Sequence, residues 1–315
     1  MASVVGDMAR VVIALGGNTL LDPTGGGPVD QQIETIETTA TEIVAAIEAG
    51  HEVVLTHGNG PQIGNLLLQQ EAAPDTPQLP LDVLVAETQA QIGYLLQQAL
   101  DNQLAGAQDF LTVVTQVVVE ANDPAFDEPT KPIGPFYAEA EAADKPFATE
   151  RVGTGDRSYR RLVPSPQPVE IVEADEIAGM VDRGNHVICG GGGGVPVVDR
   201  DGYTGIEAVI DKDLTSQVLA TAIGADRLVI LTDVEFAYLD FNAPDRRPLE
   251  TVTPSDLEPH LDAGQFGAGS MRPKIEASRR FVERGGDLAA ISTPARLMPA
   301  LDGTAGTRVR ADLQK

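Results

Sequence analysis

The chain alternates short apolar runs with amphipathic stretches, and glycine often stands between the two. "RVVIALGGNTLL" (10–21) opens this pattern, and residues 31–50 then carry apolar side chains at helical spacing up to Gly50. Strands are predicted within 10–21, 51–70, 110–120, 186–198 and 226–241, and helices within 31–50, 51–70, 80–104 and 211–224. Because alternating strands and helices build parallel sheets, we expect an α/β fold whose open, mainly parallel central sheet is sandwiched by helices.

One stretch interrupts this alternation. Residues 121–168 concentrate proline, glycine and charge, with a few aromatic residues and a short Ala/Glu segment between them. A structureless loop of this length is uncommon inside a compact domain. We therefore expect an ordered excursion from the sheet, which would form a small protruding subdomain.

The charge balance is strongly acidic. The 47 Asp and Glu residues outnumber the 22 Lys and Arg residues, giving a formal charge of −25. Nucleic acid is not an expected partner, because phosphate backbones require a basic face. Acidic excess with little lysine resembles proteins adapted to a high-salt cytoplasm, where ions screen the repulsion. An acidic interaction tail is the alternative, but the carboxylates are spread along the chain.

Other broad features narrow the class of protein further. No apolar run is long enough for a membrane span, and the first residues show no signal-peptide pattern, so we expect a cytoplasmic protein. The single cysteine, Cys189, excludes an intrachain disulfide, and the four histidines lack zinc-ligand spacing. We therefore expect no zinc site built from cysteine or histidine.

Three glycine-rich segments are candidate anion sites. "LGGN" (15–18) and "HGNGPQ" (57–62) each follow a predicted strand and precede a helix, where free backbone amides can bind phosphate. Each could also be only a tight connection without a ligand. "CGGGGGVP" (189–196) indicates either close approach of the backbone to a phosphate chain or a flexible hinge.

Lysine is scarce, and three of the five lysines lie in distinctive segments. These are "PTKPIGP" with Lys131, "DKD" with Lys212 and "GSMRPK" with Lys274. A phosphoryl group in transfer is a compact anionic cluster that point charges stabilise well, whereas residual surface lysines are the alternative. Asp211 and Asp213 could bind a metal, hold Lys212 or cap a helix beginning at Leu214.

Taken together, these segments resemble one family over nearly the whole chain. "VVIALGGNTLL", "THGNGPQIGNLLLQQ", "PTKPIGPF", "VPSPQP", "GIEAVIDKDL" and "GSMRPKIEA" are similar to the carbamate kinases of the amino-acid kinase superfamily. The resemblance implies reversible phosphoryl transfer between ADP and carbamoyl phosphate, with Mg²⁺ carried by the nucleotide. It also implies a homodimer and ATP formation in the arginine deiminase pathway of arginine breakdown.

The resemblance also implies residue roles and an organisation into lobes. One domain would span 1–315, with an acceptor lobe at 8–185 that includes the excursion and a nucleotide lobe at 186–315. The phosphate- and carbamate-binding residues would be Gly16, Gly17, Asn18, Gly58, Asn59, Gly191 and Gly192. The residues acting on the phosphoryl group would be Lys131, Lys212 and Lys274, with Asp213 orienting the lysines. The nucleotide would contact Thr232, Asp233, Tyr238, Gly269, Ser270 and Met271, and Arg272 is a possible additional contact.

No general base is expected, because carbamate is already an anion. Two other interpretations stay open on the same fold: a kinase of another small acid or phosphonate, and a non-catalytic nucleotide-binding regulator. The three motif lysines argue against the regulator.

Overall fold

The centre of the protein is a twisted sheet of eight strands, within the residues that the computed structural model describes: 8–17, 29–106 and 110–312. In spatial order the strands are β15 (Thr251–Val252), β17 (Thr307–Val309), β16 (Leu288–Ser292), β12 (Arg227–Leu231), β1 (Arg10–Leu15), β2 (Glu52–His57), β9 (His186–Ile188) and β3 (Phe110–Thr112). All neighbours pair in parallel except β16 and β17. The expected mainly parallel sheet is confirmed.

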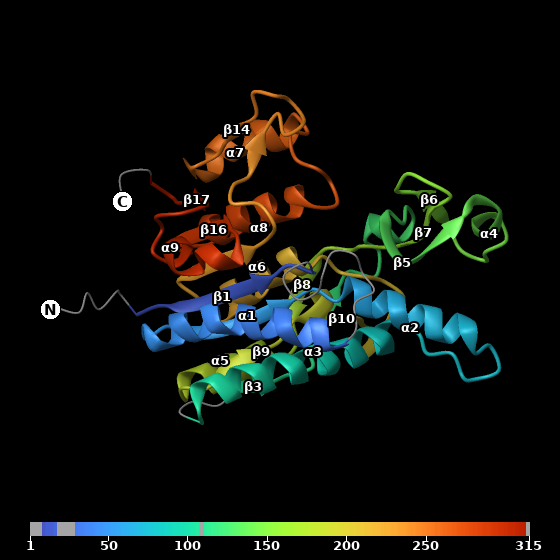
Figure 1. Ribbon diagram of the computed structural model, residues 1–315, viewed down its shortest axis with the longest axis horizontal. Coiled ribbons are helices and arrows are strands. Elements are labelled where there is room, and N and C mark those ends of the chain that lie inside the picture. Colours follow the sequence, from blue (N-terminus) through green and yellow to red (C-terminus); the bar gives the residue numbers. More distant parts are fainter. Residues whose placement is uncertain (1–7, 18–28, 107–109, 313–315) are drawn as a thin grey trace, which may run out of the picture.

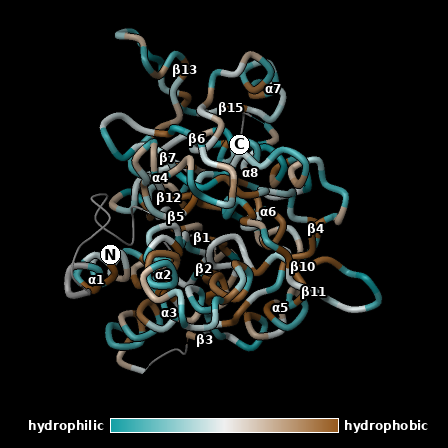
Figure 2. The backbone as a smooth tube through the Cα atoms, turned by 90° about the vertical axis from the view of Figure 1, so that its right-hand side faces the viewer, coloured by the Kyte–Doolittle hydropathy of each residue, from teal (hydrophilic) through white to brown (hydrophobic). Residues whose placement is uncertain are grey.

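Helices cover both faces of this sheet, as Figures 1 and 2 show. One face carries α1 (Val29–Glu48), α3 (Leu81–Leu104) and α9 (Leu297–Leu301), and the other carries α5 (Ala174–Asp182), α6 (Lys212–Ala222) and α8 (Met271–Glu283). Alternate residues of β1 join opposite cores, since Val12 packs on the α6 side and Ile13 on the α1 side. A strand buried on both faces explains why its sequence is continuously apolar.

Three strand predictions need correction. The run 110–120 is not one strand, because it divides into β3 and β4 (Gln116–Val119), which lie in different sheets. The chain turns at Thr115, whose backbone N–H and carbonyl are both bonded by the amide of Gln89 on α3. The run 186–198 divides into β9 and β10 (Val195–Asp199), which also lie in different sheets. The run 226–241 divides into β12 and β13 (Tyr238–Leu239).

Smaller elements surround the central layers. The second sheet has the order β11 (Tyr203–Gly205), β10 (Val195–Asp199), β4 and β8 (Pro168–Ile171). Outside the excursion there are also α7 (Pro254–Asp262), the strand β14 (Arg247–Pro248) paired with β13, and the short 3-10 helices η2 (Pro124–Phe126), η3 (Gly191–Gly193) and η4 (Pro294–Arg296). The hairpin of β13 and β14 lies near α7, away from α3 (Figure 1).

The predicted excursion forms a small subdomain beside α2 (Gly60–Ala72), as Figure 1 shows. It consists of β5 (Lys131–Ala138), α4 (Glu139–Ala143), β6 (Thr149–Arg151) and β7 (Arg157–Val163), with the antiparallel sheet order β5-β7-β6. Glu71 near the end of α2 accepts hydrogen bonds from Tyr137 and Lys145 of the excursion. These contacts attach the subdomain to the helix that begins at the second glycine turn.

Candidate functional site

The two glycine turns meet at the carboxyl ends of β1 and β2. Gly58 donates its N–H to Leu15 O at 3.1 Å, and a Cβ at Gly58 would lie only 3.1 Å from the nitrogen of Gly17. The strands place Gly16, Gly17 and Gly58 together because they are parallel neighbours in the sheet. Asn18, predicted to bind phosphate, lies outside the described residues.

The glycine run packs against this site and is buried from Gly190 to Gly194. Gly192 has a φ of +65°, and a Cβ there would lie 2.1 Å from Nδ2 of Asn59. A Cβ on Gly193 would lie 2.2 Å from the carbonyl oxygen of Ile210. The run therefore permits close packing between neighbouring segments, which neither prediction for it described. Gly192 lines the small cavity described below, whereas Gly191 lies against His57.

Asn59 and His57 are held firmly by the surrounding structure. Asn59 Nδ2 donates to Thr88 Oγ1 at 2.9 Å, which fixes its amide in a buried position. His57 Nδ1 lies 3.0 Å from the carbonyl oxygen of Gly58, and burial lowers the pKa of His57 to about 4. His57 is thus neutral at physiological pH and adds no charge to the site.

The start of α6 differs from the prediction, because the helix begins at Lys212 and its N-cap is Asp211. Asp211 Oδ1 accepts the N–H of Asp213 at 3.0 Å, while its Oδ2 forms an ion pair with Lys131 at 2.8 Å. Asp211 therefore caps the helix and also attaches the excursion to it. Of the roles left open for Asp213, holding lysines is the one its contacts support.

Asp213 bridges two lysines from different helices. Its two carboxylate oxygens lie 2.7 Å from Lys212 Nζ and 2.7 Å from Lys274 Nζ, on α6 and α8 respectively. Lys274 donates a hydrogen bond with good geometry. Beyond this carboxylate, Lys212 Nζ has no hydrogen-bond acceptor among the described residues. An ammonium has three N–H groups, so those not directed at Asp213 are available to a ligand.

Burial and mutual attraction set the charge states of this trio. Burial alone would raise the pKa of Asp213, but the two lysines outweigh it and hold that pKa well below the usual range. Burial would also lower the pKa of Lys274, but the attraction of Asp213 raises it overall. Burial, helped by the like charge of Lys274, lowers the pKa of Lys212. The two side chains are almost equally buried, but Lys274 repels Lys212, whereas Asp233 adds its attraction to that of Asp213 at Lys274.

These groups line a cavity of about 320 Å³, called the small cavity here. The glycine turns, the excursion, α6 and the segment before α8 all contribute to it. Its charged lining residues are Lys131, Arg160, Asp211, Lys212, Asp213 and Lys274. Four cations face two carboxylates, so the cavity has an excess of two positive charges in a protein of charge −25.

Arg160 is a cavity residue that the sequence did not reveal. It lies on β7, between Ser158 and Val163, which are buried. Among seventeen arginines and next to Arg161, nothing in the local sequence distinguishes it. The only signal was its place in the excursion that also carries Lys131.

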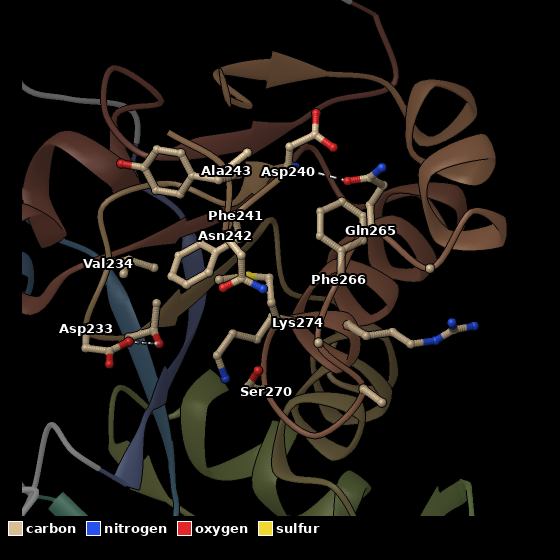
Figure 3. Close-up of a pocket in the computed structure, with 17 residues that line it drawn as sticks. Asp233, Val234, Asp240, Phe241, Asn242, Ala243, Gln265, Phe266, Ser270 and Lys274 are labelled. Carbon is tan, nitrogen blue, oxygen red and sulfur yellow. Dashed lines mark hydrogen bonds between the residues drawn. The ribbon is translucent and has the colours of Figure 1, made fainter. Parts of the chain in front are cut away.

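A second cavity of about 930 Å³ adjoins the first, and is called the large cavity here. The predicted nucleotide residues that line it are Thr232, Asp233, Tyr238, Ser270 and Met271. The remaining one, Gly269, lines the small cavity instead. Ser270 and Lys274 line both cavities, and Figure 3 shows these two side chains at one end of the large cavity.

The sequence also missed part of the large cavity. Phe241, Asn242, Gln265 and Phe266 line it, and Figure 3 shows them above Lys274 and Ser270. They lie on loops that the β13–β14 hairpin and α7 bring to the cavity. Arg272 lines the cavity too, and its Nε donates to Glu276 at 2.9 Å.

Two features of the described residues bear on other classes of function. No group of three or more His, Cys, Asp or Glu side chains in this part of the chain is arranged to hold a metal ion. None of the helices described is long and apolar enough to cross a membrane.

Comparison with known proteins gives consistent matches over the whole chain. The model of the Amino acid kinase family matches residues 9–292. A carbamate kinase of Halobacterium salinarum is 53% identical over 96% of this chain and 98% of its own length. A carbamate kinase of Thermococcus kodakarensis is 46% identical over 96% of this chain and 99% of its own length.

A solved structure agrees with the sequence matches. Carbamate kinase from Giardia lamblia, bound to AMP-PNP, superposes with a TM-score of 0.89 at 41% identity, covering 97% of this chain and 99% of that one. The fold, the sequence identity and the nearly complete coverage lead to the same conclusion. The chain belongs to the amino acid kinase family, in its carbamate kinase branch.

Proposed function

We propose that the protein transfers a phosphoryl group reversibly between carbamoyl phosphate and ADP, giving ATP and carbamate, which breaks down to ammonia and CO₂. The observation that carries this proposal is the junction of the two cavities at Lys274 and Ser270. The large cavity has the room for a nucleotide, and the small cavity has the positive charge for a phosphoryl group and a small acid. Transfer would take place where they meet.

Positioning and charge would do the catalytic work. Lys212 and Lys274 would bind the oxygens of the transferring phosphoryl group, and Asp213 would hold both ammonium groups in place. Lys131 would reach the acceptor from the excursion, with Asp211 as its partner when no substrate is bound. Carbamate needs no deprotonation before its oxygen attacks phosphorus, so a general base is unnecessary.

The glycine turns would let the phosphoryl group approach the backbone closely. The N–H groups of Gly16 and Gly58 are already donated to Leu231 O and Leu15 O, so any backbone donors to the ligand would come from neighbouring residues of the turns. Gly16, Gly17, Gly58 and Asn59 lie at the carboxyl ends of β1 and β2, where α2 begins. Gly192 would complete this wall of the small cavity, with Gly191 behind it. The nucleotide would contact Thr232, Asp233, Tyr238, Ser270 and Met271, with Gly269 on the side of the transferred group.

Mg²⁺ would enter with the nucleotide. This ion commonly binds substrate phosphates and waters with few protein ligands, which fits a site whose described side chains form no three-residue metal cluster. When bound, it would neutralise charge on the nucleotide phosphates. Removal of Mg²⁺ with a chelator should stop ATP formation, and readdition should restore it.

The direct test is coupled ATP formation from ADP and carbamoyl phosphate at high salt. ATP formation from carbamoyl phosphate supports the proposal. Activity only with another acyl phosphate or a phosphonate would mean that the enzyme uses a different acceptor. Nucleotide binding without turnover of any acceptor would favour a regulator. We propose ATP formation in the arginine deiminase pathway as the physiological direction, and the acidic composition supports a requirement for salt.

Two features of organisation are also proposed. The acceptor lobe would span 8–185 and the nucleotide lobe 186–315, although β9 from the second lobe pairs with β2 and β3 of the first.

A homodimer is supported by exposed apolar side chains near the edge strand β3, where Val114 is 44% and Tyr94 60% exposed. Light scattering should give twice the chain mass of 33.1 kDa, and a value of one chain mass would contradict the dimer.

A further inference from the structure

Arg160 differs from the other arginines of its strand. On β7, Arg157 forms an ion pair with Glu141 at 2.8 Å, and Arg161 forms one with Glu207 at 3.0 Å. Arg160 lies between them in sequence and forms no ion pair with any described residue, although the chain has more than twice as many acidic as basic residues. It is also the only member of this trio that lines the small cavity.

The guanidinium of Arg160 is held in place from one side. Its Nε donates to the carbonyl oxygen of Gly134 at 3.1 Å, and its Cζ lies 5.2 Å from the ring centroid of Phe136. Both partners are on β5, which pairs with β7 in the excursion. Its two terminal nitrogens make no hydrogen bond to the part of the chain that the structure describes. The side chain is therefore oriented, while its fork of donors stays available.

An oriented, partly buried cation without a carboxylate is costly unless an anion joins it. Burial lowers the pKa of Arg160, and no neighbouring carboxylate opposes this effect. The other three cations of the small cavity all have such a partner, since Lys131 pairs with Asp211 and both remaining lysines pair with Asp213. Arg160 is thus the cavity cation with its charge least compensated by the protein.

We propose that Arg160 binds the carboxylate end of the acceptor and determines which small acid the enzyme uses. This inference rests on the proposed function and extends it to a residue that the family motifs did not indicate. A guanidinium presents paired, coplanar donors that match the two oxygens of a carboxylate, whereas an ammonium acts as a point charge. The lysines suit the phosphoryl group, and Arg160 suits the planar group beside it.

The arrangement of the cavities supports this division of roles. Lys274 lines both cavities, so it lies on the nucleotide side, whereas Arg160 lines only the small cavity. Four apolar residues also line the small cavity: Ile63, Ile133, Val209 and Ile210. The acceptor would lie between these apolar groups, with its carboxylate toward Arg160.

The reaction would strengthen this contact in the direction of ATP formation. The bond between phosphorus and the carbamate oxygen breaks, and its electron pair stays on that oxygen. An oxygen of the ADP β-phosphate forms the new bond to phosphorus. Negative charge therefore grows on the departing carbamate, and hydrogen bonds from Arg160 become stronger as it does.

The test compares Arg160→Lys and Arg160→Gln with Arg161→Lys, which alters the neighbouring arginine outside the small cavity. Hydrogen bonds to charged groups support an expected fall in kcat/KM for carbamoyl phosphate of roughly 10- to 100-fold in both Arg160 variants. KM for ADP should stay within about twofold of the wild-type value, since a lost acceptor contact leaves the nucleotide site unchanged. Arg161→Lys should leave both constants near wild type.

A binding measurement separates the acceptor from the phosphoryl group. Calorimetry would use phosphonoacetamide, an unreactive analogue with a methylene in place of the bridging oxygen, and inorganic phosphate. Arg160→Lys should weaken the analogue about tenfold or more and phosphate by less than about threefold. Equal weakening of both would mean that Arg160 holds the phosphoryl group, and would overturn the proposal.

Two other outcomes would also overturn the proposal. Unchanged kinetics with a lower melting temperature would reduce Arg160 to a structural contact of the excursion. Loss of ADP binding equal to the loss of carbamoyl phosphate binding would indicate a general collapse of the site. Failure of the proposed function is recognised separately, because the wild-type protein itself would then form no ATP from carbamoyl phosphate.

Discussion

Removing Lys212 should abolish most of the turnover while leaving the fold stable. Asp213 lies 2.7 Å from each of two ammonium groups, so Lys212→Met leaves it paired with Lys274. No buried charge is orphaned, which is the usual cause of a large loss of stability. Asp213 is the only polar partner of Lys212 Nζ among the described residues, so the substitution removes no other polar contact.

The magnitude follows from the role proposed for this ammonium. Loss of one preorganised donor to a transition-state charge costs about 2.7–4 kcal/mol, or about 10²- to 10³-fold in kcat. Lys212 carries a full charge in a buried position, so we expect at least this loss. The melting temperature should shift by only a few degrees, since about 1 kcal/mol moves it by about 2–4 °C in a chain of 150–250 residues.

The assay is ATP formation at saturating ADP and carbamoyl phosphate, with thermal unfolding measured in the same buffer. Arg279→Met is the control, because Arg279 lies on α8 in an exposed pair with Glu283 at 2.7 Å and lines neither cavity. It removes one positive charge as well, and should leave kcat within about twofold. Near-normal turnover of a folded Lys212→Met protein would refute the reasoning.

Three further substitutions probe the same site. Asp211→Asn should keep the helix cap but remove the ion pair with Lys131, which should raise KM for carbamoyl phosphate with little change in stability. Asp211→Ala should in addition lower the free energy of unfolding by about 1 kcal/mol, measured with urea. Equal stability of the two variants would contradict the capping role of Asp211. Asp213→Asn should lower the free energy of unfolding at pH values above 3.8, the ordinary pKa of the Asp213 carboxyl. Because the folded protein depresses this pKa, the difference between wild type and variant should shrink as the pH falls below 3.8. A difference in unfolding free energy that does not change with pH would contradict the prediction. Gly192→Ala should lower the melting temperature and the activity together, because a Cβ would collide with Asn59; a fully stable and active variant would show that this contact is not needed.

Much of the central sheet could be predicted because its physical cause is local. β1 is buried on both faces, so its residues are apolar without alternation, and a glycine turn follows it. The lysines were equally visible, since lysine is rare in this chain and each stands in a distinctive segment. Lys212 and Lys274 come together because α6 and α8 pack against each other, and Asp213 holds both ammonium groups.

The remaining features depend on contacts between distant segments. The division of 110–120 into two strands results from Gln89, which lies 26 residues before the turn at Thr115. The packing of the glycine run depends on Asn59 and Ile210, which no local pattern connects to it. Arg160 differs from Arg161 in having no acidic partner among the described residues and in lining the small cavity, and both differences exist only in three dimensions.

Phosphorus NMR of the wild-type protein tests the central claim most directly. Carbamoyl phosphate, ADP and Mg²⁺ would be incubated with the protein at high salt, and the phosphorus signals followed over time. The account predicts that the carbamoyl phosphate signal falls as the γ-phosphate signal of ATP rises in equal amount. Release of inorganic phosphate at the rate seen without protein, with ADP unchanged, would contradict it.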